Sequence, residues 1–208
     1  MLPHNALHEA IALWRKTKHP RFAAVATWAS TRTLLEAPRA PVAGGRKKAD
    51  GEAWVALYEV GDPLDVPRLV ASVGSGTSAV AAERVVLLSK VNDPRVISGL
   101  VDLLGAPPFR TQTALPFFRA CVKALQDSGD PRVRPALEAL AGRYKSIPAG
   151  ELVSALLRRS AESLDLVKPG PLPAAIEKKC AALEALAART PLQGSLNRAT
   201  PSRAKLPR

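Results

Sequence analysis

Histidine is scarce in this chain, and its few copies are confined to one end. His4, His8 and His19 all precede residue 20. His4 and His8 are four residues apart and would share a helical face, but two histidines do not complete a metal site and no HExxH motif is present. Without a Ser-His-Asp or Cys-His arrangement or a marked general base, the sequence predicts a non-enzymatic protein that uses no cofactor and no metal.

Cysteine is nearly as scarce. Cys121 and Cys180 lie 59 residues apart, without a CxxC motif. We expect two small buried apolar side chains rather than a disulfide, which fits a reducing cytoplasm. The start of the chain lacks the basic segment and apolar run of a secretory signal, and no run of 18 apolar residues occurs. These absences predict a cytoplasmic protein without a membrane span.

Aromatic residues are also few, at 4% of the chain, although hydrophobic residues reach 47%. Alanine, leucine and valine must therefore fill the core, and that composition favours helices over strands. The 19 prolines are then expected at helix starts and in loops, where a missing N–H costs little. Trp14, Trp28 and Trp54 are expected to pack within the N-terminal half.

Acidic residues are missing from the last part of the chain. Residues 186–208 carry five Lys/Arg and no Asp/Glu, and residues 1–50 carry nine and three. Residues 51–185 are nearly balanced, with 16 basic and 15 acidic residues, within a net charge of +12. Basic ends on a balanced body indicate contacts to an anionic partner, or serve solubility alone.

One short sequence occurs twice, as DPRVISGLVDLLG from Asp93 and DPRVRPALEALAG from Asp130. The aspartate suits a helix N-cap and the proline suits the first helical position, so each copy predicts a helix start. A glycine at the same offset, Gly105 or Gly142, would end or bend the helix. The apolar positions share one helical face in both copies, and they are Val96, Leu100, Leu103, Val133, Leu137 and Leu140.

Fainter Pro-Arg starts occur at Pro20 and Pro67, and a second helical pattern follows each start. We expect second helices within 49–61, 77–90, 113–129 and 148–164, a leading helix within 4–17 and a closing helix near 173–189. The segment 77–90 is apolar nearly all round, which predicts a deeply buried helix. In the segment 148–164 the predicted inward stripe is Leu152, Val153, Leu156 and Leu157. Helix pairs of about 40 residues must stack to bury their apolar faces.

The two matching copies resemble the first helices of HEAT-like repeats, including the bacterial variety called PBS-lyase-like, most clearly over residues 62–166. The resemblance implies a right-handed α-solenoid of about four helix pairs over residues 1–190, followed by a disordered basic tail at 191–208. HEAT-like proteins are mostly scaffolds that bind proteins or nucleic acids. A few, such as alkylpurine DNA glycosylases, are enzymes, but no residue set for that activity can be transferred to this chain.

Three basic sets are candidate partner contacts, and each has a structural alternative. The loop 37–50 and the tail 191–208 would meet an anionic partner, or are only solvated. Arginines at equal offsets after the prolines would form a binding stripe together with Arg21 and Arg68, or would bond to neighbouring carboxylates and carbonyls. The candidates are Arg46, Lys47, Lys48, Arg95, Arg132, Arg198, Arg203 and Lys205.

The sequence thus predicts a scaffold that binds another protein. The alternative is a nucleic-acid-binding module that uses phosphate contacts from the basic loop, the arginines and the tail.

Overall fold

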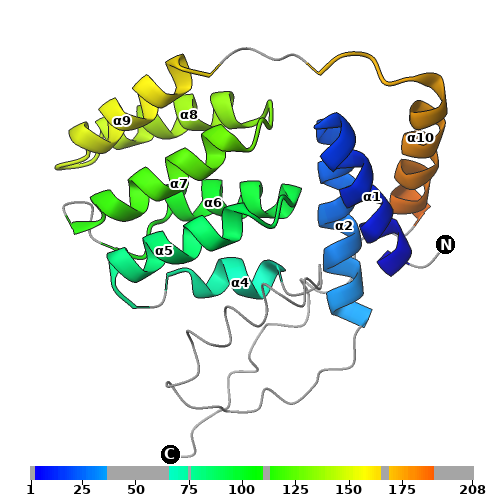
Figure 1. The fold of residues 1–208 in the computed structure, drawn as a ribbon, viewed down its shortest axis with the longest axis horizontal. Coiled ribbons are helices and arrows are strands. Elements are labelled where there is room, and N and C mark those ends of the chain that lie inside the picture. The colour runs from blue at the N-terminus through cyan, green and yellow to red at the C-terminus, as the bar shows by residue number, and fades with distance from the viewer. Residues whose placement is uncertain (1–2, 37–65, 75, 110–112, 165–168, 190–208) are drawn as a thin grey trace, which may run out of the picture.

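The computed structural model describes residues 3–36, 66–74, 76–109, 113–164 and 169–189, and these ranges contain helices and no strand (Figure 1). The all-α prediction is confirmed for them. The helices are α1 (Pro3–Thr17), α2 (Pro20–Glu36), α4 (Val66–Ser72), α5 (Ser78–Ser89), α6 (Pro94–Gly105), α7 (Leu115–Asp127), α8 (Val133–Lys145), α9 (Glu151–Glu162) and α10 (Ala174–Arg189).

Three predicted features lie outside the described residues: the helix within 49–61 with Trp54, the loop 37–50 and the tail 191–208. Within the described ranges, none of the helices has the length and apolarity that a bilayer-spanning segment requires.

Two groups of helices make up the structure. In the first, called the stack, α4, α6 and α8 lie side by side in one layer, and α5, α7 and α9 form the other (Figure 1). In the second, called the N-terminal group, α1 and α2 form a hairpin and α10 packs against both. The N-terminal group runs crosswise to the helices of the stack, and α2 contacts α6.

Local signals set most helix starts. Thr77 caps α5, and Asp93 caps α6 by accepting a hydrogen bond from the backbone N–H of Arg95, as predicted. The segment after Asp130 differs, because the helix begins at Val133 rather than directly after the aspartate. Gly105 is the last residue of α6, whereas Gly142 lies inside α8 and does not end it.

Three turns share one geometry, although one of them precedes the clear sequence repeat. In each turn a residue with positive φ precedes a side chain that accepts a hydrogen bond from the backbone N–H two residues further on. The positive-φ residues are Lys18 (51°), Asn92 (50°) and Gly129 (64°). The bonds run from Arg21 to His19 Nδ1 (3.4 Å), from Arg95 to Asp93 Oδ1 (2.8 Å) and from Arg132 to Asp130 Oδ1 (2.9 Å). The α1–α2 turn is therefore the structural counterpart of the α5–α6 and α7–α8 turns.

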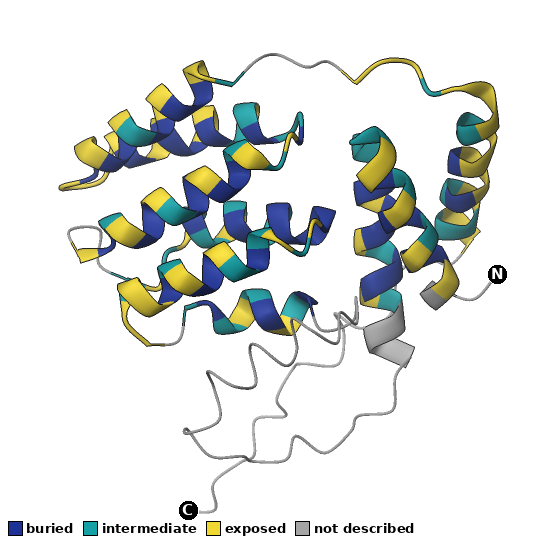
Figure 2. Cartoon of the chain, in the orientation of Figure 1, coloured by how far each residue is buried: buried dark blue, intermediate teal, exposed yellow. Residues whose placement is uncertain are grey.

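The core follows the apolar faces of the central helices (Figure 2). Phe117, Cys121 and Leu125 are fully buried on one face of α7, as the spacing predicts. Cys121 and Cys180 are both free and buried, which confirms the prediction for the cysteines. A close approach of α4 to α6 requires Gly99, because a Cβ there would lie 2.4 Å from a methyl group of Val70.

The prediction of which residues are buried is partly wrong for two helices, α9 and α5. Leu152 of α9 was expected to point inward, but it is 76% exposed. Val86 of α5 is 52% exposed, so this helix is not buried all round. Because α5 packs mainly against α7, its opposite side meets solvent and leaves apolar residues at the surface.

The last helix packs on the first two, and its charges explain why. Asp93 and Asp130 each bind the guanidinium of the arginine that follows, whereas His19 at the equivalent place carries no carboxylate. Arg21 instead donates to Glu177 at 2.7 Å and to Glu184 at 2.6 Å, both in α10. Burial of Cys180 and Leu183 completes the contact. Thus α10 supplies the carboxylates that the first turn lacks.

Candidate ligand-binding cleft

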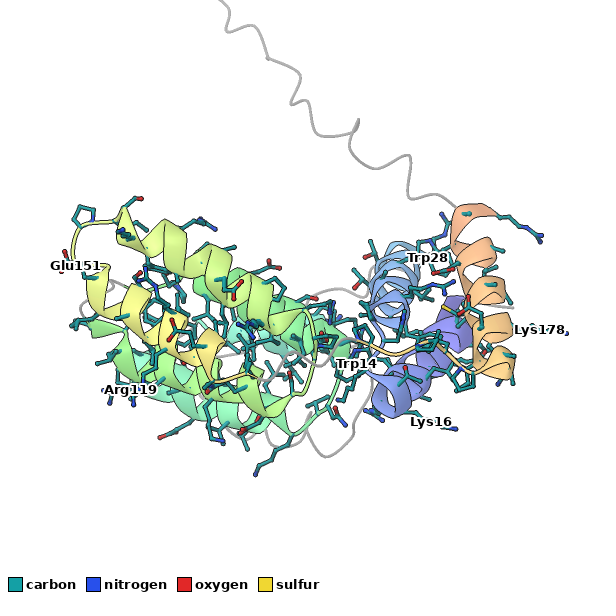
Figure 3. All side chains as sticks on the ribbon, turned by 90° about the horizontal axis from the view of Figure 1, so that it is seen from above. Trp14, Lys16, Trp28, Arg119, Glu151 and Lys178 are labelled. Atoms are coloured by element: carbon teal, nitrogen blue, oxygen red, sulfur yellow. The ribbon has the colours of Figure 1, made fainter. Side chains whose placement is uncertain are left out.

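A cleft of about 280 Å³ opens where the end of α1 meets the α5–α6 turn and the end of α7. Trp14, on its wall, lies between the N-terminal group and the stack (Figure 3). The apolar residues that line the cleft are Trp14, Val96, Ile97, Leu100 and Ala124. Its polar lining consists of Lys18, Ser89, Asn92, Asp93, Asp127 and Ser128.

Two turns with left-handed backbone form one edge of the cleft. Arg15 donates from Nε to the Asn92 carbonyl at 3.0 Å and from Nη2 to the Val91 carbonyl at 3.1 Å. Lys18 Nζ donates to Asn92 Oδ1 at 2.8 Å. Lysine rarely adopts positive φ, so these bonds help to hold a backbone conformation that is unfavourable by itself. The bonds therefore fix the end of α1 against the stack.

Lys18 occupies an unusual environment for an amine. Its Nζ lies 3.8 Å from the centre of the Trp14 ring, which places the charge over the aromatic face. Burial lowers the pKa of Lys18, Arg15 lowers it further, and Asp130 acts in the opposite direction. Among the described residues, no carboxylate forms an ion pair with Lys18.

The carboxylates around the cleft are already paired. Asp93 binds Arg95 at 2.7 Å and is 1% exposed in its side chain. Asp130 binds Arg132 at 2.6 Å, and Asp127 binds Lys123 one helical turn earlier. The charged side chains in the lining are therefore Lys18, Asp93 and Asp127, and both aspartates are paired with basic residues outside the lining.

One further donor in the cleft wall has no acceptor. Trp14 is fully buried, and its indole Nε1 has no hydrogen-bond partner among the described residues. Buried N–H groups in proteins are normally satisfied, so this inaccessible donor is an exception. It is the single such side-chain atom in the described ranges.

The predicted arginines have observed roles inside the chain. Arg95 is buried and donates to Asp93 and to Ser30 Oγ of α2 at 2.8 Å. Arg132 donates to Asp130 and to the Pro94 carbonyl of α6 at 3.3 Å. Each arginine thereby links its own turn to a neighbouring helix. This is the second of the two roles considered for the repeated arginines, in which they bond to neighbouring carboxylates and carbonyls. The partner-binding role of these two arginines stays a prediction.

Of the other predicted contacts, the structure describes Arg68. Arg68 is exposed on α4, and it does not line the cleft. The six remaining candidates lie outside the described residues, and they are Arg46, Lys47, Lys48, Arg198, Arg203 and Lys205.

Sequence reasoning missed the cleft. The available signal was positional: Lys18 and Asn92 each stand two residues before a Pro-Arg helix start. Equivalent turns of stacked helix pairs come to one edge, so residues at that offset are candidates for meeting there.

Lys18 Nζ contacts an amide and an aromatic face, and among the described residues no histidine or carboxylate forms a hydrogen bond or ion pair with it. In the described ranges, no three His, Cys, Asp or Glu side chains are grouped as a metal site would need. No family model, no curated protein and no solved structure matches this chain, so the cleft is interpreted from its own residues.

Proposed function

We propose that this chain is a non-enzymatic, cytoplasmic, HEAT-like repeat protein of about four helix pairs in a right-handed solenoid, and that it binds another protein. The equivalent turns at Lys18, Asn92 and Gly129 support the repeat interpretation, because the same turn recurs before each of the Pro-Arg segments at Pro20, Pro94 and Pro131. The stacked layers α4–α6–α8 and α5–α7–α9 are the arrangement that such pairs would produce.

The observation that carries the binding function is the mixed lining of the cleft. An apolar floor from α6 and α7 is bordered by the ammonium of Lys18 and by hydroxyls of Ser89 and Ser128. Binding sites combine apolar surface with a few polar groups that fix orientation. At about 280 Å³ the cleft is below the usual range for drug-sized ligands and suits one or two side chains of a partner.

The test is photocrosslinking from the edge of the cleft. A benzophenone amino acid replaces Ser128, which lines the cleft and is partly exposed. The matched control carries it at Arg119, on the exposed face of α7 (Figure 3). In extract of the source organism, we expect a discrete protein adduct from position 128 and none from position 119. No adduct from position 128, or the same adducts from both, would contradict the proposal.

A nucleic-acid-binding module is the second candidate, and the charge distribution favours it. Residues 186–208 carry five basic and no acidic side chains. Fluorescence anisotropy with DNA and RNA, single- and double-stranded, at two salt concentrations tests it on the full chain and on a chain lacking residues 191–208. Binding that weakens with salt and with loss of the tail supports this function, because phosphate contacts release counterions. Absence of binding at low salt rejects it.

A further inference from the structure

The most exposed large apolar side chain in the described ranges is Leu152, at the start of α9. Leu156, one helical turn later, is partly exposed, and so is Leu115 at the start of α7. Both helix starts lie at the end of the stack that Figure 3 marks with Arg119 and Glu151. Single exposed leucines are ordinary, but neighbouring ones on two helices form an apolar surface that a partner could cover.

These leucines lie on the sides of α7 and α9 that face each other. Gln126 of α7 donates from Nε2 to Ser163 Oγ, at the end of α9, at 2.8 Å. Residues four, seven and eleven positions before each of these two lie on the same side of their helix, because this spacing follows the helical repeat. The accessible members of the two rows, called the α7–α9 face, are Leu115, Arg119, Leu152, Leu156 and Arg159.

The charged members of the α7–α9 face are both arginines. Arg119 and Arg159 are exposed, and neither forms an ion pair among the described residues. The acidic residues of α9, Glu151 and Glu162, share a different row with Arg158, on the side away from α7. The acidic residue of α7 is paired with a lysine one turn earlier. The face is therefore apolar and positively charged.

Apolar surface bordered by cations suits a ligand that is apolar and acidic. We propose that the α7–α9 face binds a short acidic amphipathic segment of another protein. Its apolar side chains pack on Leu152 and Leu156, and its carboxylates pair with the two arginines. Laying an amphipathic helix on an apolar surface is a known mode of peptide recognition, and charges at the border select the partner. The inference goes beyond the cleft, because no residue of this face lines it.

Charge also argues against two other occupants. A second copy of the chain, placed face to face by a two-fold axis, would bring the same arginines together, and like charges repel. A nucleic acid would meet the arginines with its phosphates but would leave Leu152 in water, so the apolar part of the face would gain nothing. An acidic segment with apolar side chains uses both parts.

The test is fluorescence anisotropy on the full chain. The probe is a labelled peptide of repeated Glu-Glu-Leu-Leu units, a pattern that gives a helix one acidic and one apolar side. Two reference peptides each remove one property, with Gln in place of Glu or with Ser in place of Leu. We expect the probe to bind at least tenfold more tightly than either reference. Single-stranded DNA, added as a competitor, should not displace it.

Matched variants locate the binding on the α7–α9 face. Arg159→Glu should weaken the probe at least tenfold, whereas Arg158→Glu, the same change one residue away in the row with the glutamates, should leave it unchanged. Leu152→Ser should weaken it about fivefold, whereas Val86→Ser, at another exposed apolar position on α5, should not. These side chains are exposed, so an unchanged urea midpoint is expected for each variant and confirms that it is folded.

The other outcomes are decisive. Equal weakening by the two arginine variants, displacement by DNA, equal binding of either reference peptide, or no binding of the probe would each overturn the proposal. The cleft is tested separately from position 128: an adduct there without probe binding means that this inference fails alone, and probe binding without an adduct means that the cleft proposal fails alone. A benzophenone at position 119 removes one of the two arginines, so that control does not report on this face.

Discussion

The two copies of the Asp-Pro-Arg sequence should differ in energetic weight, although they are nearly identical in sequence. In the first copy both partners are inaccessible, with 1% of the Asp93 side chain and 7% of the Arg95 side chain exposed. In the second copy the Asp130 side chain is fully buried, but 32% of the Arg132 side chain is exposed. Water therefore reaches one guanidinium and not the other.

The structure predicts a larger destabilisation for Asp93→Ala than for Asp130→Ala. Removing Asp93 takes the carboxylate from Nε and Nη2 of a buried arginine, and breaking a buried pair costs about 3–5 kcal/mol. Removing Asp130 deletes the acceptor of the Arg132 backbone N–H in the turn and a pair whose arginine can turn to solvent, which costs about 1–2 kcal/mol. The expected difference of about 2 kcal/mol is a large part of a typical total stability of about 5–15 kcal/mol.

Urea unfolding followed by far-ultraviolet circular dichroism measures both losses, with the midpoints compared at a common m-value. The double variant Asp93→Ala/Arg95→Met is the control, because it removes the buried charge together with its partner. We expect it to recover part of the loss of Asp93→Ala. Equal destabilisation by the two alanine variants, or a double variant less stable than the single one, would refute the reasoning from burial.

Other positions give matched predictions. Gly142→Ala should stabilise α8 by about 0.5–1 kcal/mol, because nothing lies within 4 Å of the new Cβ. Gly150→Ala should instead destabilise the fold, since its Cβ would clash with a backbone oxygen; thermal unfolding separates the two. Arg21→Gln should loosen α10, so Cys180 should react faster with 4,4′-dithiodipyridine than in the original chain, while Cys121 stays protected. An unchanged rate at Cys180 would argue against a stabilising role of the Arg21 contacts with Glu177 and Glu184. The hydrogen bonds from Arg21 lower the pKa of Glu184 from its ordinary 4.5. The stabilisation by the ionised Glu184 is therefore complete above that pH and lost as the pH falls through the lowered pKa. Because the thiolate fraction of any cysteine falls in acid, the prediction is that Cys180 is labelled faster in acid relative to a small free thiol at the same pH.

Features that depend on a few neighbouring residues, such as helix starts, could be predicted from the sequence. Pro20 and Asp93 mark helix starts because a proline or a cap acts within one turn of backbone. The helix α8 begins at Val133 and not directly after Asp130, as was predicted. Asp130 still accepts the hydrogen bond from the backbone N–H two residues later, but it does so in a turn that precedes the helix. Local chemistry was preserved even where the helix boundary shifted.

Features that depend on which helices meet could not be predicted. Leu152 has the spacing of an inward residue, but burial needs a neighbour on that side, and none of the described helices covers α9 there. The cleft needs Trp14 and Lys18 of α1 beside Asn92, which is set by the crosswise placement of the N-terminal group. No local pattern encodes that placement.

The contact of α10 with α2 also fixes the order in which the molecule can be completed during synthesis. Arg21 and Glu177 are separated by 156 positions, and a ribosome that adds about 5–20 residues per second needs roughly 8–30 s to make the residues between them. Throughout that interval α1 and α2 exist without the carboxylates of α10, while the stack can already fold. The α1–α2 pair is therefore synthesised before the stack, but its contacts are completed only when α10 has been made.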